Sequence, residues 1–190
     1  MCGQTAFLRA LISGLFACLL LTGATTAQLV NENLLVGLPA GFKVAFQDRK
    51  NNVQMTEAIP SNETLQNWTE MVTIQIFFGR KDTPDQFRSR LEQRWRAVCA
   101  DGRGDEVTKG AERGYPFAIF VLSCPENPKT GKPEITWFKA VQGNDSFYLV
   151  QKAFKYMLSK DQVTQTMKYL GAVTVCDSRI ADRSCPMTRR

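Results

Sequence analysis

The residues of this chain that could do chemistry are cysteines, carboxylates, and aromatic and cationic side chains, because histidine is absent from all 190 residues. Histidine is the commonest general base and metal ligand near neutral pH. Catalysis would therefore have to use carboxylates, lysine, tyrosine or a thiol, and the sequence favours a binding role over an enzymatic one. No nucleophile elbow, phosphate-binding loop or dinucleotide fingerprint occurs, and no cofactor is expected.

Four of the six cysteines lie in the part of the chain that is predicted to fold: Cys99, Cys124, Cys176 and Cys185. An even count in an exported chain favours disulfides. Of the three possible pairings we expect Cys99–Cys124, tying the end of a helix to the end of the following strand, and Cys176–Cys185, pinning the C-terminal tail. A four-thiolate metal site and a redox-active dithiol are the alternatives. Both are disfavoured because no Cys-x-x-Cys pair is present, so no metal is expected.

A band of aromatic and cationic residues covers two adjacent predicted strands near the C-terminal end of the domain. Its candidate ligand contacts are Trp137, Tyr148, Lys152 and Tyr156. On an exposed sheet face this mixture suits a polar ligand, a glycan or a single-stranded polyanion. Under a covering helix the same side chains would be core, and the sequence leaves both possibilities open.

Carboxylates in or beside predicted strands offer a second possible chemistry, since paired carboxylates can perform acid–base catalysis. They are Glu57, Glu63, Glu70 and Glu134. Glu57 shares a strand face with apolar neighbours, so an inward position would make it the most interesting titratable group. An outward position would make it an ordinary glutamate of an edge strand.

The N-terminal segment has the three parts of a cleavable export signal. Met1 to Arg9 carries one basic residue, and Ala10 to Leu21 is an apolar run of 12 residues. Such a run is too short for a bilayer, which needs about 20 residues. We expect residues 1–27 to be a signal peptide, and a retained anchor or a lipid attached at Cys18 are the alternatives. The expected location is periplasmic or secreted, without a transmembrane segment after signal removal.

The remaining charges give a basic but mixed surface. Signal removal takes away Arg9 alone among the charged residues, leaving 23 basic against 18 acidic side chains. A basic surface favours anionic partners. We expect an unknown protein or an anionic or polymeric envelope ligand as the partner, and no nucleic acid.

The elements that must position these residues follow from hydrophobic periodicity. Alternation in residues 41–48 and 53–59 predicts a hairpin, and residues 68–78 form the strongest strand, expected near the sheet centre. Three further strands are predicted at 116–123, 134–142 and 146–156, after a turn at 101–105.

Two helices are predicted by their capping boxes. The first starts after Thr83 and turns Phe87, Leu91, Trp95 and Val98 to the core. Its arginines, expected to be solvated surface with a binding patch as the alternative, are Arg88, Arg90, Arg94 and Arg96. The second helix starts after Ser159 and is expected to stop at Gly171.

Because strands come in runs, the sequence predicts an α+β domain: an antiparallel sheet flanked by two main helices in a layered, disulfide-stabilised sandwich. The expected organisation is one domain over residues 28–176, with a possible short edge strand at 173–175. A tail over residues 177–190 would be held by its disulfide.

The order of elements and the opening LPAGFKVAFQ resemble the Mog1/PsbP-like sandwich of small exported bacterial proteins of the DcrB type, over roughly residues 35–175. The strings NWTEMVTIQIF, CPENPKTGKPEITWFKA and YLVQKAF are similar to an uncharacterised exported family of Gram-negative bacteria. The resemblance implies a non-catalytic envelope or secreted accessory protein. It transfers no catalytic residue.

The leading hypothesis is therefore an exported, non-enzymatic binding or accessory protein. The first alternative is a secreted effector or carboxylate-dependent hydrolase, which requires a cleft with two acids. The second is an inhibitor or immunity-type protein, for which residues 125–133 would supply a rigid exposed loop.

Overall fold

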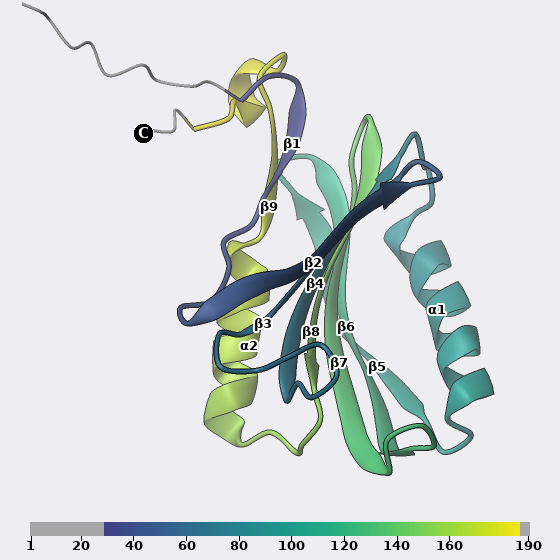
Figure 1. Cartoon of the computed structure of the whole chain (residues 1–190). Coiled ribbons are helices and arrows are strands. Elements are labelled where there is room, and N and C mark those ends of the chain that lie inside the picture. Colours follow the sequence, from purple (N-terminus) through teal and green to yellow (C-terminus); the bar gives the residue numbers. More distant parts are fainter. Residues whose placement is uncertain (1–28, 187–190) are drawn as a thin grey trace, which may run out of the picture.

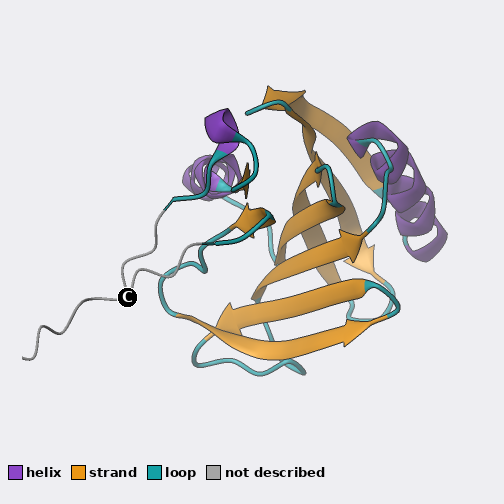
Figure 2. Cartoon of the chain, turned by 90° about the horizontal axis from the view of Figure 1, so that it is seen from above, coloured by secondary structure: helices purple, strands orange, loops and turns teal. Residues whose placement is uncertain are grey.

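The computed structural model describes residues 29–186, so the predicted signal peptide, Cys18 and the last four residues lie outside the described range. Over this range the chain forms a layered α+β domain (Figures 1 and 2). The strands are β1 (Glu32–Leu35), β2 (Phe42–Lys50), β3 (Val53–Pro60), β4 (Glu70–Phe78), β5 (Arg103–Glu112), β6 (Tyr115–Asn127), β7 (Lys132–Gln142), β8 (Ser146–Phe154) and β9 (Thr174–Asp177). The helices are α1 (Pro84–Val98), α2 (Lys160–Ala172) and the short 3-10 helix η1 (Ala181–Arg183).

Within residues 29–186 the main sheet has seven antiparallel strands in the order β2-β3-β4-β8-β7-β6-β5, and β1 pairs with β9 in a separate ribbon. Helix α1 packs on one face of the sheet, over the half that contains β5, β6 and β7 (Figure 1). Helix α2 and the β1–β9 ribbon cover the opposite face. The predicted fold class is confirmed, including the inner position of β4.

The local signals at the helix starts act as the sequence predicts. Thr83 Oγ1 accepts a hydrogen bond from the backbone N–H of Gln86, and Ser159 Oγ accepts one from that of Gln162. In turn, the side-chain oxygen of each glutamine accepts a hydrogen bond from the backbone N–H of its capping residue. These reciprocal bonds satisfy donors that a helix start leaves unpaired. Helix α2 continues one residue beyond the predicted stop at Gly171.

Two strands were not expected from the sequence. Strand β5 begins at Arg103, inside the turn predicted at residues 101–105, and its side chains are almost all exposed. The segment before residue 39 contains β1, which is only four residues long. The predicted tail also differs, because Asp177 belongs to β9 and residues 181–183 form η1.

Both predicted disulfides are present, Cys99–Cys124 and Cys176–Cys185. Cys99 is the C-terminal cap of α1. Cys124 lies on β6, so the first bridge skips β5 and does not reach the strand that directly follows the helix, contrary to the expectation. The second bridge joins β9 to the residues after η1.

The α1 face of the sheet carries an aromatic core. The rings of Phe120 and Phe138 stack with centroids 4.8 Å apart, and those of Phe87 and Phe147 stack at 4.6 Å. Offset stacking of this kind adds to the stabilisation from apolar burial. The core holds α1 on the sheet through Phe87, Leu91 and Trp95.

A buried lysine anchors the end of α2. Lys139 on β7 is 2 % exposed, and its Nζ donates to Glu112 Oε2 at 2.7 Å and to the carbonyl oxygen of Val173 at 2.6 Å. Val173 is the C-terminal cap of α2, and the last turn of α2 contains no basic residue. Lys139 therefore supplies, from the sheet, the positive charge that a helix C-terminus favours.

The turn between β7 and β8 is closed by a carboxylate from the other end of the chain. Glu32 on β1 accepts hydrogen bonds from the backbone N–H groups of Asn144, Asp145 and Ser146 and from Tyr148 Oη. A Cβ on Gly143 would lie 2.2 Å from Glu32 Oε1, so only glycine leaves room for this contact. Glu32 thus fastens the β1–β9 ribbon to the main sheet.

We expect acid to weaken the ribbon through Asp177. This residue is fully buried, and bidentate hydrogen bonds from Arg179 hold the pKa of its carboxyl below the ordinary value of 3.8. A lowered folded-state pKa means that the stabilisation is complete well above pH 3.8 and is lost as the pH falls through the folded-state value. In melting curves between about pH 6 and pH 2, Asp177→Asn should be less stable at the upper end, and the gap to the natural chain should close towards pH 2. A gap that does not change with pH would contradict this assignment.

No helix within residues 29–186 combines the length and apolar character needed to cross a membrane.

Candidate ligand-binding groove

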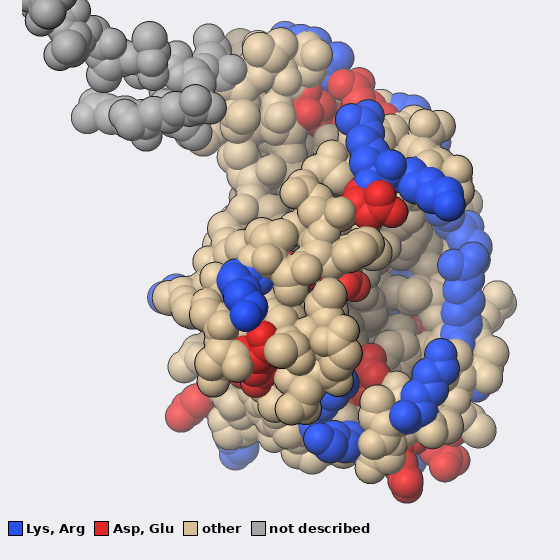
Figure 3. Space-filling view, viewed as in Figure 1, with Lys and Arg blue, Asp and Glu red and all other residues tan. Residues whose placement is uncertain are grey.

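A continuous hollow runs between α1 and the uncovered half of the sheet. Figure 3 shows it as a deep groove with a row of basic side chains along the α1 side. It consists of two adjoining cavities of about 210 and 220 Å³, which share Leu91 and Arg94. The first is also lined by Trp95, Val98, Cys99, Cys124, Asn127 and Glu134, and the second by Gln75, Phe77, Arg80, Phe87, Arg90, Leu149 and Gln151. We call these two cavities together the α1 groove.

The strand register explains why the groove exists. Helix α1 covers β5, β6 and β7 and reaches β4 at Phe77, but it leaves the rest of the same face of β3 and β4 open. Directly opposite residues on antiparallel strands share a face. Met55, Gln75 and Leu149 form one row across β3, β4 and β8.

Polar side chains interrupt this apolar face where the helix no longer covers it. Gln151 Nε2 donates to Gln75 Oε1 at 2.9 Å, joining β8 to β4 across the groove floor. In the next row Glu57 lies opposite Thr73, and Thr73 lies opposite Gln151. The floor therefore offers amide donors and acceptors beside apolar surface.

The groove is cationic at the end that lies near the start of α1. The guanidinium of Arg80 lies 5.3 Å from the ring centroid of Phe77 and 5.1 Å from that of Phe87. Asp82 forms ion pairs with both Arg80 and Arg90. Burial alone would raise the pKa of Asp82, but the two guanidinium groups hold it below its ordinary value. Asp82 therefore stays charged and neutralises part of the positive charge.

Arg94 is the arginine that a ligand can reach without breaking an existing pair. It is exposed, lines both cavities, and forms no ion pair with any residue of the described range. Arg88, by contrast, lies on another side of α1, where it pairs with Glu92 and Glu106. One cation of α1 is thus available in the groove.

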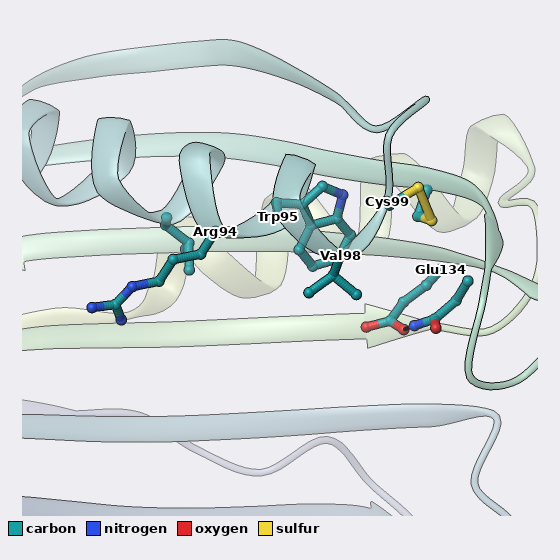
Figure 4. Close-up of a pocket in the computed structure, with 8 residues that line it drawn as sticks. Arg94, Trp95, Val98, Cys99 and Glu134 are labelled. Carbon is teal, nitrogen blue, oxygen red and sulfur yellow. Dashed lines mark hydrogen bonds between the residues drawn. A yellow bond between two sulfur atoms is a disulfide. The ribbon is translucent and has the colours of Figure 1, made fainter.

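The end of the groove near the C-terminus of α1 is lined differently. Figure 4 shows the side chains of Trp95 and Val98, the Cys99 disulfide and Glu134 gathered around this cavity. Trp95 Nε1 donates to the carbonyl oxygen of Ser123, which holds the indole against the sheet. Glu134 Oε2 accepts a hydrogen bond from Asn127 Nδ2 at 2.5 Å. This end is an apolar recess with one carboxylate at its margin.

Lys155 does not neutralise that carboxylate by direct contact. Its Nζ lies 3.7 Å from the ring centroid of Trp68, and the described residues give it no ion pair with Glu134. Burial lowers the pKa of Lys155, against the opposing effect of the nearby Glu134 charge.

The edges of the main sheet are less suited to binding than the groove. Strand β2 has a register irregularity between Val44 and Phe46, and β5 has one between Glu106 and Thr108. Bulges and charged residues on edge strands oppose the addition of a further strand. Both edges carry these two features.

The four sequence-predicted ligand residues lie on the opposite face, under α2 and the β1–β9 ribbon. Trp137 is 9 % exposed in the core beneath α2, and Tyr148 is 2 % exposed and donates to Glu32. Tyr156 donates to Glu70, and Lys152 Nζ lies 3.6 Å from the Glu70 carboxylate. These side chains are therefore covered, as in the alternative in which a helix lies over the aromatic band. They pack α2 and the ribbon against the sheet and do not form an open ligand face.

The predicted carboxylates do not form a pair in the groove. Glu134 is the one carboxylate among the residues that line its two cavities. Glu63 accepts hydrogen bonds from the backbone and side chain of Thr69, and Glu70 is bound by Tyr156. The described residues also contain no group of three or more aspartate, glutamate or cysteine side chains that could hold a metal ion.

The predicted loop at residues 125–133 is the tip of the β6–β7 hairpin. The carbonyl oxygen of Asn127 accepts hydrogen bonds from the N–H groups of Thr130 and Gly131, and its side chain accepts one from Lys129. The tip is exposed and held by these local bonds, and Asn127 and Glu134 at its base line the groove.

Sequence reasoning missed the floor of the groove. Gln75 and Gln151 each stand inside an apolar strand, in TIQIF and YLVQKAF, and a polar residue in such a run was the available signal. The arginines of α1 were identified, and the structure separates Arg90 and Arg94, which line the groove, from Arg88 and Arg96, which do not.

Comparison with known proteins identifies no family for this chain. No protein family and no curated protein matches the chain. A similar solved structure is the Ran-binding protein Mog1p of Saccharomyces cerevisiae, with a TM-score of 0.41 and 10 % identity over 75 % of this chain and 85 % of Mog1p.

Proposed function

We propose that this protein is an exported, non-enzymatic binding protein of the bacterial envelope or extracellular space, related to the DcrB-type proteins. Its ligand is an extended segment of a partner protein, held in the α1 groove. The observation that carries this proposal is the continuity of the groove, whose two cavities share Leu91 and Arg94. The two disulfides support export, because such bonds persist mainly in oxidising compartments.

The shape of the groove favours a chain segment over a compact small molecule. The two cavities, of about 210 and 220 Å³, follow one another along α1 and meet at Leu91 and Arg94, so a ligand that fills both must be elongated. An extended peptide can occupy both cavities in succession. It also presents backbone donors and acceptors to Gln75 and Gln151 on the floor.

The charges favour a peptide over a uniform polyanion. Arg94 offers an unpaired cation, but Glu134 would repel a ligand that is anionic along its whole length. A peptide can place an acidic residue at one point and an uncharged or basic residue at another. The groove therefore suits a partner segment that contains at least one acidic and one apolar residue.

A peptide-display selection on the oxidised chain from residue 28 tests this proposal. We expect enrichment of segments with an acidic residue near an apolar one, and we expect Arg94→Glu to weaken the best peptide at least about tenfold, as reversal of a contacting charge does. Arg96→Glu is the matched control, because Arg96 is an exposed arginine of α1 that does not line the groove. It should change affinity by less than about twofold. Equal losses in both variants, or no enriched peptide, would refute the proposal.

A further inference from the structure

The two ends of the α1 groove carry opposite charges. Arg80 and Arg90 lie at the start and in the first half of α1, where Asp82 pairs with both, and Arg94 lies between the two cavities. Glu134 lies beside the C-terminal end of α1, with the disulfide and Val98. Between them the surface is apolar.

Glu134 is available to a ligand cation. It is half-buried, and its one described hydrogen bond comes from the neutral amide of Asn127. No lysine or arginine of the described range forms an ion pair with it, and the nearby Lys155 rests on Trp68 instead. A partly desolvated carboxylate with a single neutral partner gains from a charged donor that arrives with the ligand.

The order of side chains along α1 fixes the order that a ligand must match. Trp95 and Val98 line the recess beside Glu134, and the Arg94 side chain extends in the opposite direction along the groove (Figure 4). An acidic residue on the Arg94 guanidinium therefore lies on the other side of the recess from Glu134. An extended segment that fills the recess with an apolar side chain then presents its next residues on that side to Glu134.

We infer that the ligand segment is bipolar, with an acidic residue at Arg94, then an apolar residue against Trp95 and Val98, and then a basic residue at Glu134. This inference rests on the proposed function. It adds the basic position and the order of the three residues. One of the two chain directions is selected, giving either acidic, apolar, basic or its reverse.

The same peptide selection, carried out on a charge-reversed groove, tests the inference. In the natural chain the enriched peptides should carry lysine or arginine on the far side of the apolar residue from the acid. With Glu134→Lys that position should change to aspartate or glutamate, while the acid that meets Arg94 stays. With Glu134→Gln the basic preference should disappear, and the best natural-chain peptide should bind at least fivefold more weakly.

Two controls separate the possible failures. Glu126→Lys alters an exposed glutamate of the same hairpin that does not line the groove, and it should leave the selected sequences unchanged. Melting curves of each variant establish that the fold is kept, and Glu134→Gln keeps a polar side chain beside Asn127. Peptides with the acidic and apolar positions but no basic preference would overturn the inference and leave the proposed function standing. No enriched peptide at all would overturn both.

Discussion

Replacing Cys99 and Cys124 together by alanine is expected to lower the free energy of unfolding by about 3.5 kcal/mol and to weaken peptide binding in the α1 groove. The sulfurs join positions 25 residues apart, and the loss follows from the greater freedom of the unfolded chain without this link. The bridge also ties the C-terminal end of α1, one side of the groove, to β6 in the sheet. Removing the bridge lets the cavity at the C-terminal end of α1, which Cys99 and Cys124 line, change shape.

The second disulfide provides the control. Cys176 and Cys185 close a shorter loop, with a separation of 9 residues, so their joint replacement by alanine should cost about 2.7 kcal/mol. That bridge does not line the groove, and peptide binding measured well below the melting temperature should be unchanged. Guanidinium unfolding of both double variants gives the two energies. A larger loss for the Cys176–Cys185 pair, or equal effects on binding, would contradict the assigned roles.

Glu112→Ala is expected to destabilise the fold by about 3 kcal/mol, because it leaves the Lys139 ammonium buried without its carboxylate partner. Lys139 would keep its bond to Val173, but one carbonyl oxygen does not balance a full charge at 2 % exposure. The loss should appear in equilibrium unfolding. The end of α2 should exchange its amide hydrogens faster than in the natural chain.

A second substitution distinguishes an unpaired charge from a simple loss of contact. Adding Lys139→Met to Glu112→Ala removes the ammonium and keeps a flexible apolar side chain of similar length. The double variant should recover about 2 kcal/mol, retaining a penalty of about 1 kcal/mol for the unpaired Val173 carbonyl. A double variant that is less stable than Glu112→Ala would show that Lys139 contributes mainly through packing.

Much of the fold could be predicted because its signals are local. The capping boxes at Thr83 and Ser159 and the alternation in residues 41–59 depend on neighbours in sequence, and each specifies an element. Strand β5 escaped prediction because its edge position leaves nearly all its side chains exposed on both faces. A strand without a buried face has no hydrophobic alternation to detect.

The candidate site was harder to predict because it depends on which face each helix covers. Trp137 and Tyr148 look the same in sequence whether a helix covers them or not, and only the packing of α2 and the ribbon decides that they are buried. Gln75 and Gln151 form a hydrogen bond although they lie 76 positions apart in the sequence. Arg94 and Arg96 differ by two positions on one helix, a rotation of about 200°, and this alone separates a groove residue from a surface one.

The ribbon of β1 and β9 sets the order in which the domain can fold. The contact between Asn31 and Ser178 joins residues 147 positions apart, and closing so long a loop is slow compared with forming the hairpins of the main sheet. A chain that emerges from its N-terminal end must hold β1 unpaired, with the apolar side chains of Leu34 and Val36 unprotected, until β9 arrives. Strand β9, the last strand of the described range, therefore completes the pairing of β1, and a truncation before Thr174 leaves β1 without its β partner.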